Sequence, residues 1–284
     1  MTQNGGATEF FRSGSDDYER THYRASTRSF ISDRNVLLLQ VLAKLPLSKA
    51  DSLLEVGCGP GHFLAGAKQH CAHLVGVDTS AEMLYLSRTR LTASPLETPR
   101  LVGGSITGLP FPDDSFKVVV SAGVLEYFPN SAVPLREMHR VLRPGGFALI
   151  PITNRLSPAL VTARLLDRLK RWPRIMDPFN RAWTRRGRPP IRPRHFPVRL
   201  DTPFSHRKAL QGAGFELVAE HFFHLAPLPR PAEQLAPRVT SRLLNATDVL
   251  LHSPLRFLAE GYLAVCTKRG PVTIPAHNHP GDRV

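Results

Sequence analysis

One stretch of the sequence, residues 53–62, constrains the fold more than any other. It starts as an apolar run, which is typical of a buried parallel strand, and continues through Gly57, Gly59 and Gly61. Residues 63–68 then follow at helical spacing, so the glycines lie where a strand passes into a helix. Glycine suits such a turn because its backbone adopts left-handed conformations and lets a ligand approach closely. We therefore predict a nucleotide-binding turn between a strand and a helix.

The glycine spacing indicates which nucleotide this turn binds. A dinucleotide fingerprint reads G-x-G-x-x-G and holds a pyrophosphate at the helix N-terminus, whereas here the pattern is G-x-G-x-G and His62 takes the sixth position. A second apolar run ends in Asp78, about twenty residues further on, where an acid accepts hydrogen bonds from ribose hydroxyls. Together with Glu55 inside the first strand, this spacing favours S-adenosylmethionine (SAM), which has no phosphate, over NAD.

Apolar runs and helical repeats alternate along the chain. We expect strands near 52–56, 73–77, 99–102, 117–121 and 147–151, and helices near 35–45, 61–71, 80–91 and 131–142. This alternation predicts an α/β fold, a doubly wound, mostly parallel sheet with helices on both faces. Ligands of such sheets bind beyond the carboxyl ends of the strands, and Gly57, Asp78, Ser105 and Ser121 all fall there, which predicts a single site.

These motifs resemble those of class I SAM-dependent methyltransferases, particularly the small-molecule branch that includes the ubiquinone and menaquinone biosynthesis enzymes. The matching segments follow one another in order at residues 53–61, 77–84, 109–116, 124–127 and 142–146. The resemblance implies a Rossmann-like, seven-stranded sheet whose final strand, near 262–266, is inserted antiparallel beside the sixth. It also implies that SAM is the cofactor and that the protein is a methyltransferase.

The resemblance further implies which residues surround the cofactor. Relatives often carry an acid after the third strand, where this chain has Ser105, a weaker hydrogen-bond acceptor for the adenine amino group. Candidates for a general base are Glu126 and Tyr127, which follow the fourth strand, and His206 in the poorly matched half. The three cysteines lack metal-ligand spacing, and we expect no metal. The expected cofactor contacts are Glu55, Gly57, Cys58, Gly59, Gly61, Asp78, Thr79, Met83, Ser105, Ile106 and Ser121.

The positive charge of the chain is concentrated in one segment. The formal net charge is +14, and between residues 151 and 200 thirteen basic residues accompany only two acids, Asp167 and Asp177. In the same segment Val161, Leu165 and Trp172 recur at helical spacing among arginines, which is typical of a basic amphipathic helix at a membrane interface. The alternative, weighted equally, is a lid over the substrate pocket whose charges are simply solvated.

The length of 284 residues suits one decorated α/β domain. We predict disordered tails at 1–15 and 269–284 around a single methyltransferase domain at 16–268. Within it we expect a core at 35–151, the basic insertion or lid at 152–202, and C-terminal strands and helices at 203–268. The odd cysteine count, the absence of a signal-peptide pattern and the absence of an apolar run of ~18 residues predict a cytoplasmic protein, with a peripheral contact to an anionic membrane as a further expectation.

Three functions are compatible with these patterns. The leading hypothesis is a SAM-dependent methyltransferase that transfers a methyl group to a small-molecule acceptor, lipid-like or anionic, by in-line displacement. An RNA methyltransferase would use the basic insertion, but the chain lacks an Asn/Asp-Pro-Pro-Tyr-type motif after the fourth strand, so nucleic acid is the less favoured partner. A non-catalytic SAM-binding protein is the third; the intact glycine turn argues against it, and Ser105 leaves it open. The acceptor, the methylated atom and the oligomeric state stay undetermined.

Overall fold

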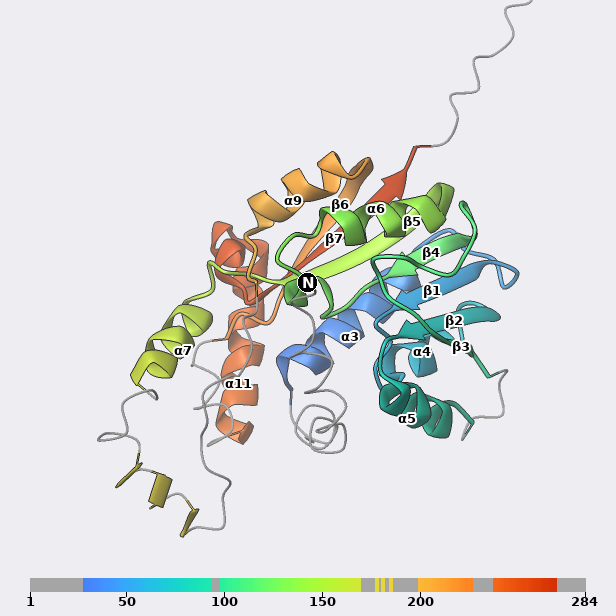
Figure 1. Cartoon of the computed structure of the whole chain (residues 1–284). Coiled ribbons are helices and arrows are strands. Elements are labelled where there is room, and N and C mark those ends of the chain that lie inside the picture. Colours follow the sequence, from blue (N-terminus) through green and yellow to red (C-terminus); the bar gives the residue numbers. More distant parts are fainter. Residues whose placement is uncertain are drawn as a thin grey trace, which may run out of the picture.

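A sheet of seven strands crosses the part of the chain that the computed structural model describes, which comprises residues 28–92, 98–169, 177–178, 180–181, 184–185, 199–226 and 237–269 (Figure 1). The strands are β1 (Ser52–Val56), β2 (His73–Asp78), β3 (Arg100–Gly103), β4 (Phe116–Val120), β5 (Leu142–Thr153), β6 (Phe215–Phe223) and β7 (Gly261–Lys268). Their order across the sheet is β3-β2-β1-β4-β5-β7-β6.

The strand directions follow the predicted topology. β1 pairs in parallel with β2 and β4, and parallel pairing continues outward to β3 and β5. β7, the last strand in the sequence, lies between β5 and β6 and is antiparallel to both. The prediction of a doubly wound, mostly parallel seven-stranded sheet, with an antiparallel final strand beside the sixth, is therefore confirmed.

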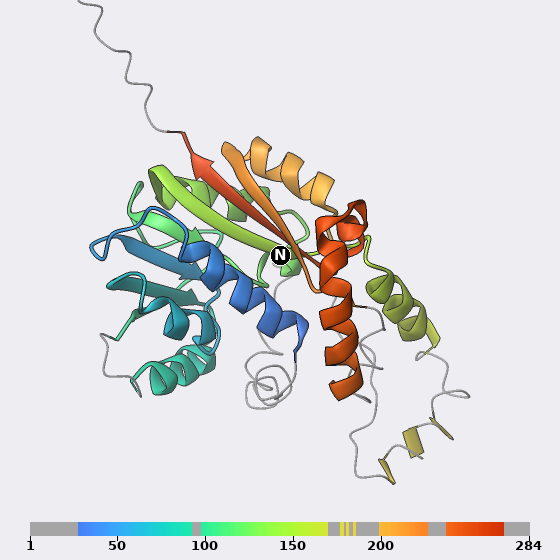
Figure 2. The same ribbon diagram turned by 180° about the vertical axis from the view of Figure 1, so that it is seen from behind.

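Helices cover both faces of the sheet because neighbouring strand residues point to opposite sides. Leu53 packs with the apolar faces of α3 (Phe30–Leu42) and α4 (His62–Ala67), and α5 (Ala81–Thr92) lies next to them. Leu54 packs on the other side, with α6 (Ala132–Val141) and α9 (Pro203–Gly212). Figure 2 shows α3 lying across its face of the sheet.

The remaining described elements gather beyond the carboxyl end of β5. They are the helices α7 (Pro158–Leu169) and α11 (Pro237–Thr247), followed by the 3₁₀ turns η2 (Asp248–His252) and η3 (Pro254–Leu258). A further 3₁₀ turn, η1 (Leu125–Tyr127), follows β4. No helix among the described residues is both long enough and apolar enough to cross a membrane.

Three elements differ clearly from their expected bounds. The helix expected near 35–45 is α3, which begins at Phe30 and ends at Leu42. β5 begins at Leu142 instead of near residue 147, because Leu142 already pairs with Phe116 ahead of a bulge in the β4–β5 ladder. α4 ends at Ala67, several residues before the expected end. Trp172, most of the basic loop and the tails at 1–15 and 270–284 lie outside the described residues, so the predicted domain bounds stay predictions.

Candidate functional site

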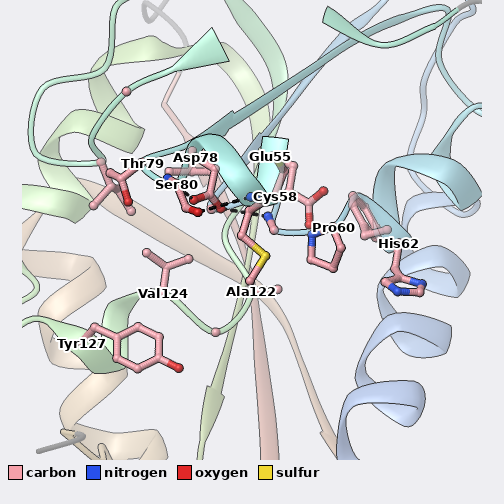
Figure 3. Close-up of a pocket in the computed structure, with 18 of the residues that line it drawn as sticks. Glu55, Cys58, Pro60, His62, Asp78, Thr79, Ser80, Ala122, Val124 and Tyr127 are labelled. Atoms are coloured by element: carbon pink, nitrogen blue, oxygen red, sulfur yellow. Dashed lines mark hydrogen bonds between the residues drawn. The ribbon is translucent and has the colours of Figure 1, made fainter. Parts of the chain in front are cut away.

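A cavity of about 150 Å³ opens at the carboxyl ends of β1, β2 and β4 (Figure 3). This is the edge at which ligands bind in doubly wound sheets. Many of the residues expected to surround the cofactor contribute to its wall. They are Glu55, Gly57, Cys58, Gly59, Asp78, Thr79, Met83, Ser105 and Ile106, and they are joined by the base candidate Tyr127.

The glycine turn contributes backbone to the cavity wall for two different reasons. Gly57 has φ +73°, and a Cβ there would lie 2.1 Å from Cγ2 of Val124, so the loop after β4 packs directly on the turn. Gly59 has φ +49°, and a Cβ there would meet nothing within 4 Å among the described residues. The missing side chain at Gly57 therefore makes room for Val124, whereas the one at Gly59 leaves open space for a ligand beside the backbone.

Asp78 holds the loops at the ends of β1 and β2 together. Its Oδ2 accepts a hydrogen bond from the N–H of Gly59 at 2.9 Å, and its Oδ1 accepts one from the N–H of Ser80 at 2.9 Å (Figure 3). Burial raises the pKa of Asp78, while these N–H donors oppose that shift by favouring the carboxylate. Each carboxylate oxygen retains a second lone pair, which gives the cavity an acceptor for sugar hydroxyls.

Glu55 is a second acid in the wall and is only 5% exposed. Its Oε2 has no hydrogen-bond partner among the described residues. Burial raises its pKa to about 8, against the attraction of the Arg34 guanidinium. A buried carboxyl group with free acceptor capacity at a cavity wall suits a ligand that carries positive charge.

Arg34 is a wall residue that the sequence analysis did not identify. It lies on α3, is 8% exposed, and approaches Gly123 so closely that a Cβ there would be 2.8 Å from Nη1. The signal was nevertheless present in the sequence. Arg34 occupies the same helical face as the buried Leu38, Val41 and Leu42, where a cation is costly unless it meets an anion.

Two expected cofactor contacts, Gly61 and Ser121, lie outside the described wall of this cavity. A Cβ on Gly61 would come within 2.3 Å of Oγ of Ser87, so this glycine permits close packing of α4 on α5. Ser121 is 1% exposed, and its N–H donates to the carbonyl of Leu149 in β5. Both residues therefore shape the floor beneath the turn.

The two other base candidates lie in different surroundings. Glu126 lines a smaller adjoining cavity, where its Oε2 accepts a hydrogen bond from Oγ1 of Thr153 at 3.2 Å; Arg199 and Asp201 complete the polar part of that wall. His206 lines neither cavity in the described part of the chain. Its ring is fully buried, and burial lowers its pKa to about 4, so the imidazole is neutral at physiological pH.

No group of three or more His, Cys, Asp or Glu in the described segments is arranged to hold a metal ion. The three cysteines are buried and unpaired, and burial raises the pKa of the Cys58 thiol, which keeps it protonated. The groups available at this edge include carboxylates, a guanidinium, backbone amides, the Tyr127 phenol and the His62 imidazole.

Comparisons with known proteins agree with this geometry. Residues 54–150, which run from β1 into β5, match the family model for a methyltransferase domain. The chain is 36% identical over 113 residues to the probable methyltransferase ltbC of Aspergillus luteorubrus, covering 35% of this chain and 39% of that protein. It is 34% identical over 144 residues to the demethylmenaquinone methyltransferase of Lysinibacillus sphaericus strain C3-41, covering 50% and 59%.

The fold is shared with solved methyltransferases. The magnesium protoporphyrin IX methyltransferase of Synechocystis PCC 6803, solved with bound SAM, aligns with a TM-score of 0.59 at 11% identity, covering 94% of this chain and 98% of that one. The predicted resemblance to class I SAM-dependent methyltransferases, including quinone-biosynthesis enzymes, is confirmed. The chain spans 39% and 59% of the length of these two curated relatives.

Proposed function

We propose that this protein binds SAM in the cavity at β1, β2 and β4 and transfers its methyl group to a small-molecule acceptor. The observation that carries the proposal is the pairing of two acids with an open glycine turn. Asp78 presents acceptor oxygens, Glu55 presents a buried carboxyl group, and Gly59 leaves the space between them clear. An adenosine that carries a positively charged amino-acid end fits this distribution of groups.

Each part of the ligand has a counterpart in the wall. Asp78 would accept hydrogen bonds from the ribose hydroxyls, and Ser105 and Ile106 would contact the adenine. Glu55 and Arg34 would face the ammonium and carboxylate of the methionine moiety, because the two side chains line one cavity and carry opposite charge. The backbone at Gly59 would lie against the ligand without a side chain between them.

The protein's contribution to the reaction is orientation and dehydration. Bound SAM supplies a methyl group that is already activated by the sulfonium, and attack by the acceptor releases S-adenosylhomocysteine. Holding the acceptor in line with that methyl group supplies ~7–11 kcal/mol of the barrier reduction. Tyr127 in the main cavity and Glu126 in the adjoining cavity are the groups we propose to receive a proton from an oxygen or carbon acceptor.

The acceptor we propose has an apolar body and a polar or anionic head. Ala122, Val124 and Phe128 give the main cavity an apolar side, and the adjoining cavity carries Arg199 beside Asp201. The curated relative from L. sphaericus is a demethylmenaquinone methyltransferase by name, which supports a lipid-like acceptor of the quinone kind. A peripheral contact with an anionic membrane is the partner that such an acceptor favours.

Calorimetry with SAM, S-adenosylhomocysteine and NAD tests the binding half of this proposal. We expect heat with the first two ligands and none with NAD, and an absence of heat with both adenosine ligands would refute it. Transfer is tested with SAM labelled in the methyl group and a demethylated quinone as acceptor. Label in the quinone fraction supports the proposal, whereas binding without transfer to any extracted lipid or small molecule favours a non-catalytic SAM-binding protein.

A further inference from the structure

Exposed apolar side chains are concentrated at one end of the molecule. Fourteen large apolar side chains are exposed among the described residues. Ten of these lie in or beside α7, α11, η2 and η3 or at the start of α9. The ten are Leu156, Val161, Leu165, Phe204, Val239, Leu243, Val249, Leu250, Leu255 and Leu258. Single exposed apolar residues are ordinary, but ten of them gathered at one end of the molecule suggest an interaction surface.

α7 presents its apolar stripe to solvent. Val161 and Leu165, four residues apart, are 56% and 60% exposed, whereas Ala159 and Leu160 are buried. Arg164 and Arg168 are also exposed and lie one turn apart beside this stripe. The solvent-exposed side of α7 thus carries an apolar stripe with arginines along its margin.

α11 repeats this arrangement with different residues. Val239, Leu243 and Leu250 are exposed and follow one another at helical spacing into η2, whereas Leu244 on the opposite side is fully buried. Arg242 is exposed beside the stripe. In η3, Leu255 and Leu258 are exposed together with Arg256, which lies over the rings of Phe222 and Phe257.

This end of the molecule adjoins the proposed active site. α7 follows the carboxyl end of β5, and η3 precedes β7, whose first residue Gly261 pairs with Thr153 at the end of β5. The side-chain amide of Asn154 donates to the carbonyls of Phe257 and Ala259, both at 2.8 Å, and so joins the start of the α7 segment to η3. Figures 1 and 2 show α7 and α11 together at this end, remote from α5.

We propose that the exposed stripes of α7, α11, η2 and η3 form a docking face for an anionic phospholipid bilayer. The inference deepens the proposed function and rests on it, because a lipid-like acceptor would then reach the carboxyl ends of the strands from the membrane that holds it. The apolar stripes enter the boundary between head groups and acyl chains, and the arginines contact lipid phosphates.

The combination of groups on this face favours a bilayer over other occupants. RNA would satisfy the arginines but leave the aliphatic stripes without a partner, since RNA recognition relies on stacking side chains and the exposed aromatic residue in this described group is Phe204 alone. A second copy docked symmetrically would bring the face against itself and place Arg164, Arg168 and Arg242 near their own equivalents, which is repulsive. An anionic bilayer matches both the apolar and the cationic groups.

Vesicle sedimentation of the full chain tests the docking face. The probes are vesicles of phosphatidylcholine and phosphatidylglycerol in equal parts, and vesicles of phosphatidylcholine alone. We expect binding to the anionic vesicles, weakened at least ~10-fold by Arg164→Glu with Arg168→Glu, because each basic residue at an anionic surface contributes on the order of a fivefold gain. Val161→Ser with Leu165→Ser should weaken it similarly. The matched controls Arg88→Glu on α5 and Val133→Ser on α6, exposed at other sites, should bind like wild type.

A fluorophore reports contact with the acyl region directly. Because Cys58, Cys71 and Cys266 are buried, a cysteine introduced by Leu243→Cys can be labelled selectively in the folded protein. An environment-sensitive label there should shift to the blue on anionic vesicles, and the same label at Val133→Cys should not.

Several results would overturn this docking face. They are an absence of vesicle binding by wild type, loss in the arginine variant without loss in the serine variant, RNA binding with a steep salt slope in place of vesicle binding, or a dimer dispersed by Val161→Ser with Leu165→Ser. SAM calorimetry on the same preparations separates the two proposals. Vesicle binding without SAM binding refutes the proposed function, and SAM binding without vesicle binding refutes the docking face alone.

Discussion

The N–H of Gly59 donates a 2.9 Å hydrogen bond to Oδ2 of Asp78, so the acid at the end of β2 holds the glycine turn at the end of β1. Asp78 therefore has two tasks in the proposed site. It fixes the shape of the turn through its accepted bonds, and it offers its remaining lone pairs to the ligand. Substitutions at this position act on both tasks, which makes the choice of replacement decisive.

We predict that Asp78→Asn weakens SAM binding about as much as Asp78→Ala does. Both oxygens of Asp78 accept from backbone N–H groups, whereas an asparagine amide would direct its own N–H toward one of these donors. An unpaired buried donor costs about 1–3 kcal/mol, or roughly 5- to 150-fold in affinity. Calorimetry measures the loss, and retention of wild-type affinity by Asp78→Asn would contradict this dual role.

Gly57→Ala and Gly59→Ala should separate folding from binding. A Cβ at residue 57 would lie 2.1 Å from Val124, so Gly57→Ala should lower the thermal midpoint clearly. A Cβ at residue 59 meets open space, so Gly59→Ala should retain a native circular dichroism spectrum, with ~1 kcal/mol of backbone strain, and lose SAM binding. If Gly59→Ala binds SAM normally, the ligand lies elsewhere.

The raised pKa of Glu55 predicts how folding stability depends on pH. The folded protein retains a proton on Glu55 up to about pH 8, whereas the unfolded chain releases it near the ordinary pKa of 4.5. Wild type should therefore lose stability relative to Glu55→Gln as the pH rises through this range. Chemical unfolding of both proteins from pH 5 to 9 measures the difference, and parallel curves would refute the buried titration.

The affinity for SAM should also depend on the protonation of Glu55, but it should rise with pH where the folding stability falls. A positively charged ligand favours the carboxylate form of Glu55, so SAM affinity in wild type should rise with pH until the pKa of about 8 has been passed. Glu55→Gln should bind more weakly and without this rise. Calorimetry at several pH values provides the measurement, and an identical rise in the variant would assign the pH dependence to another group.

Acid unfolding should involve Asp33 on α3. Burial alone would raise the pKa of this carboxyl, but hydrogen bonds from His224 and Arg28 hold it below its usual value. A carboxyl group whose pKa is lower in the folded than in the unfolded protein stabilises the fold at pH values above its unfolded pKa. This stabilisation is lost as the pH falls through the folded pKa. Asp33→Asn should cost ~2 kcal/mol at pH 7, and this cost should shrink as the pH falls below 3.8, the ordinary pKa of the carboxyl. The exposed Asp113→Asn serves as the control, and equal effects of the two substitutions would contradict this role.

The sequence was sufficient for those parts of the fold that depend on local pattern. Adjacent residues such as Leu53 and Leu54 pack on opposite faces of the sheet, and that alternation is visible in the letters alone. The glycine turn and Asp78 likewise carried enough information to predict where the cavity lies. In each case the constraint acts within a few residues, or between two motifs at a fixed spacing.

The features of the fold and the site that could not be predicted from the sequence depend on contacts between distant segments. The early start of β5 follows from the pairing of Leu142 with Phe116, and the place of Arg34 in the cavity wall follows from the approach of α3 to Gly123. The exposure of apolar side chains on α11, η2 and η3 likewise depends on which side of these elements packs against the rest of the molecule. Amphipathic periodicity gives the apolar face of a helix but not the direction in which that face points.

The position of β7 sets a condition on how the chain reaches its native state during synthesis. Of the seven strands in the described sheet this one leaves the ribosome last, yet it lies between β5 and β6 and pairs with both. Until residue 268 has emerged, β5 and β6 each present an unpaired edge at the place where the sheet must close. The nascent protein therefore depends on protection of those two edges until β7 has emerged.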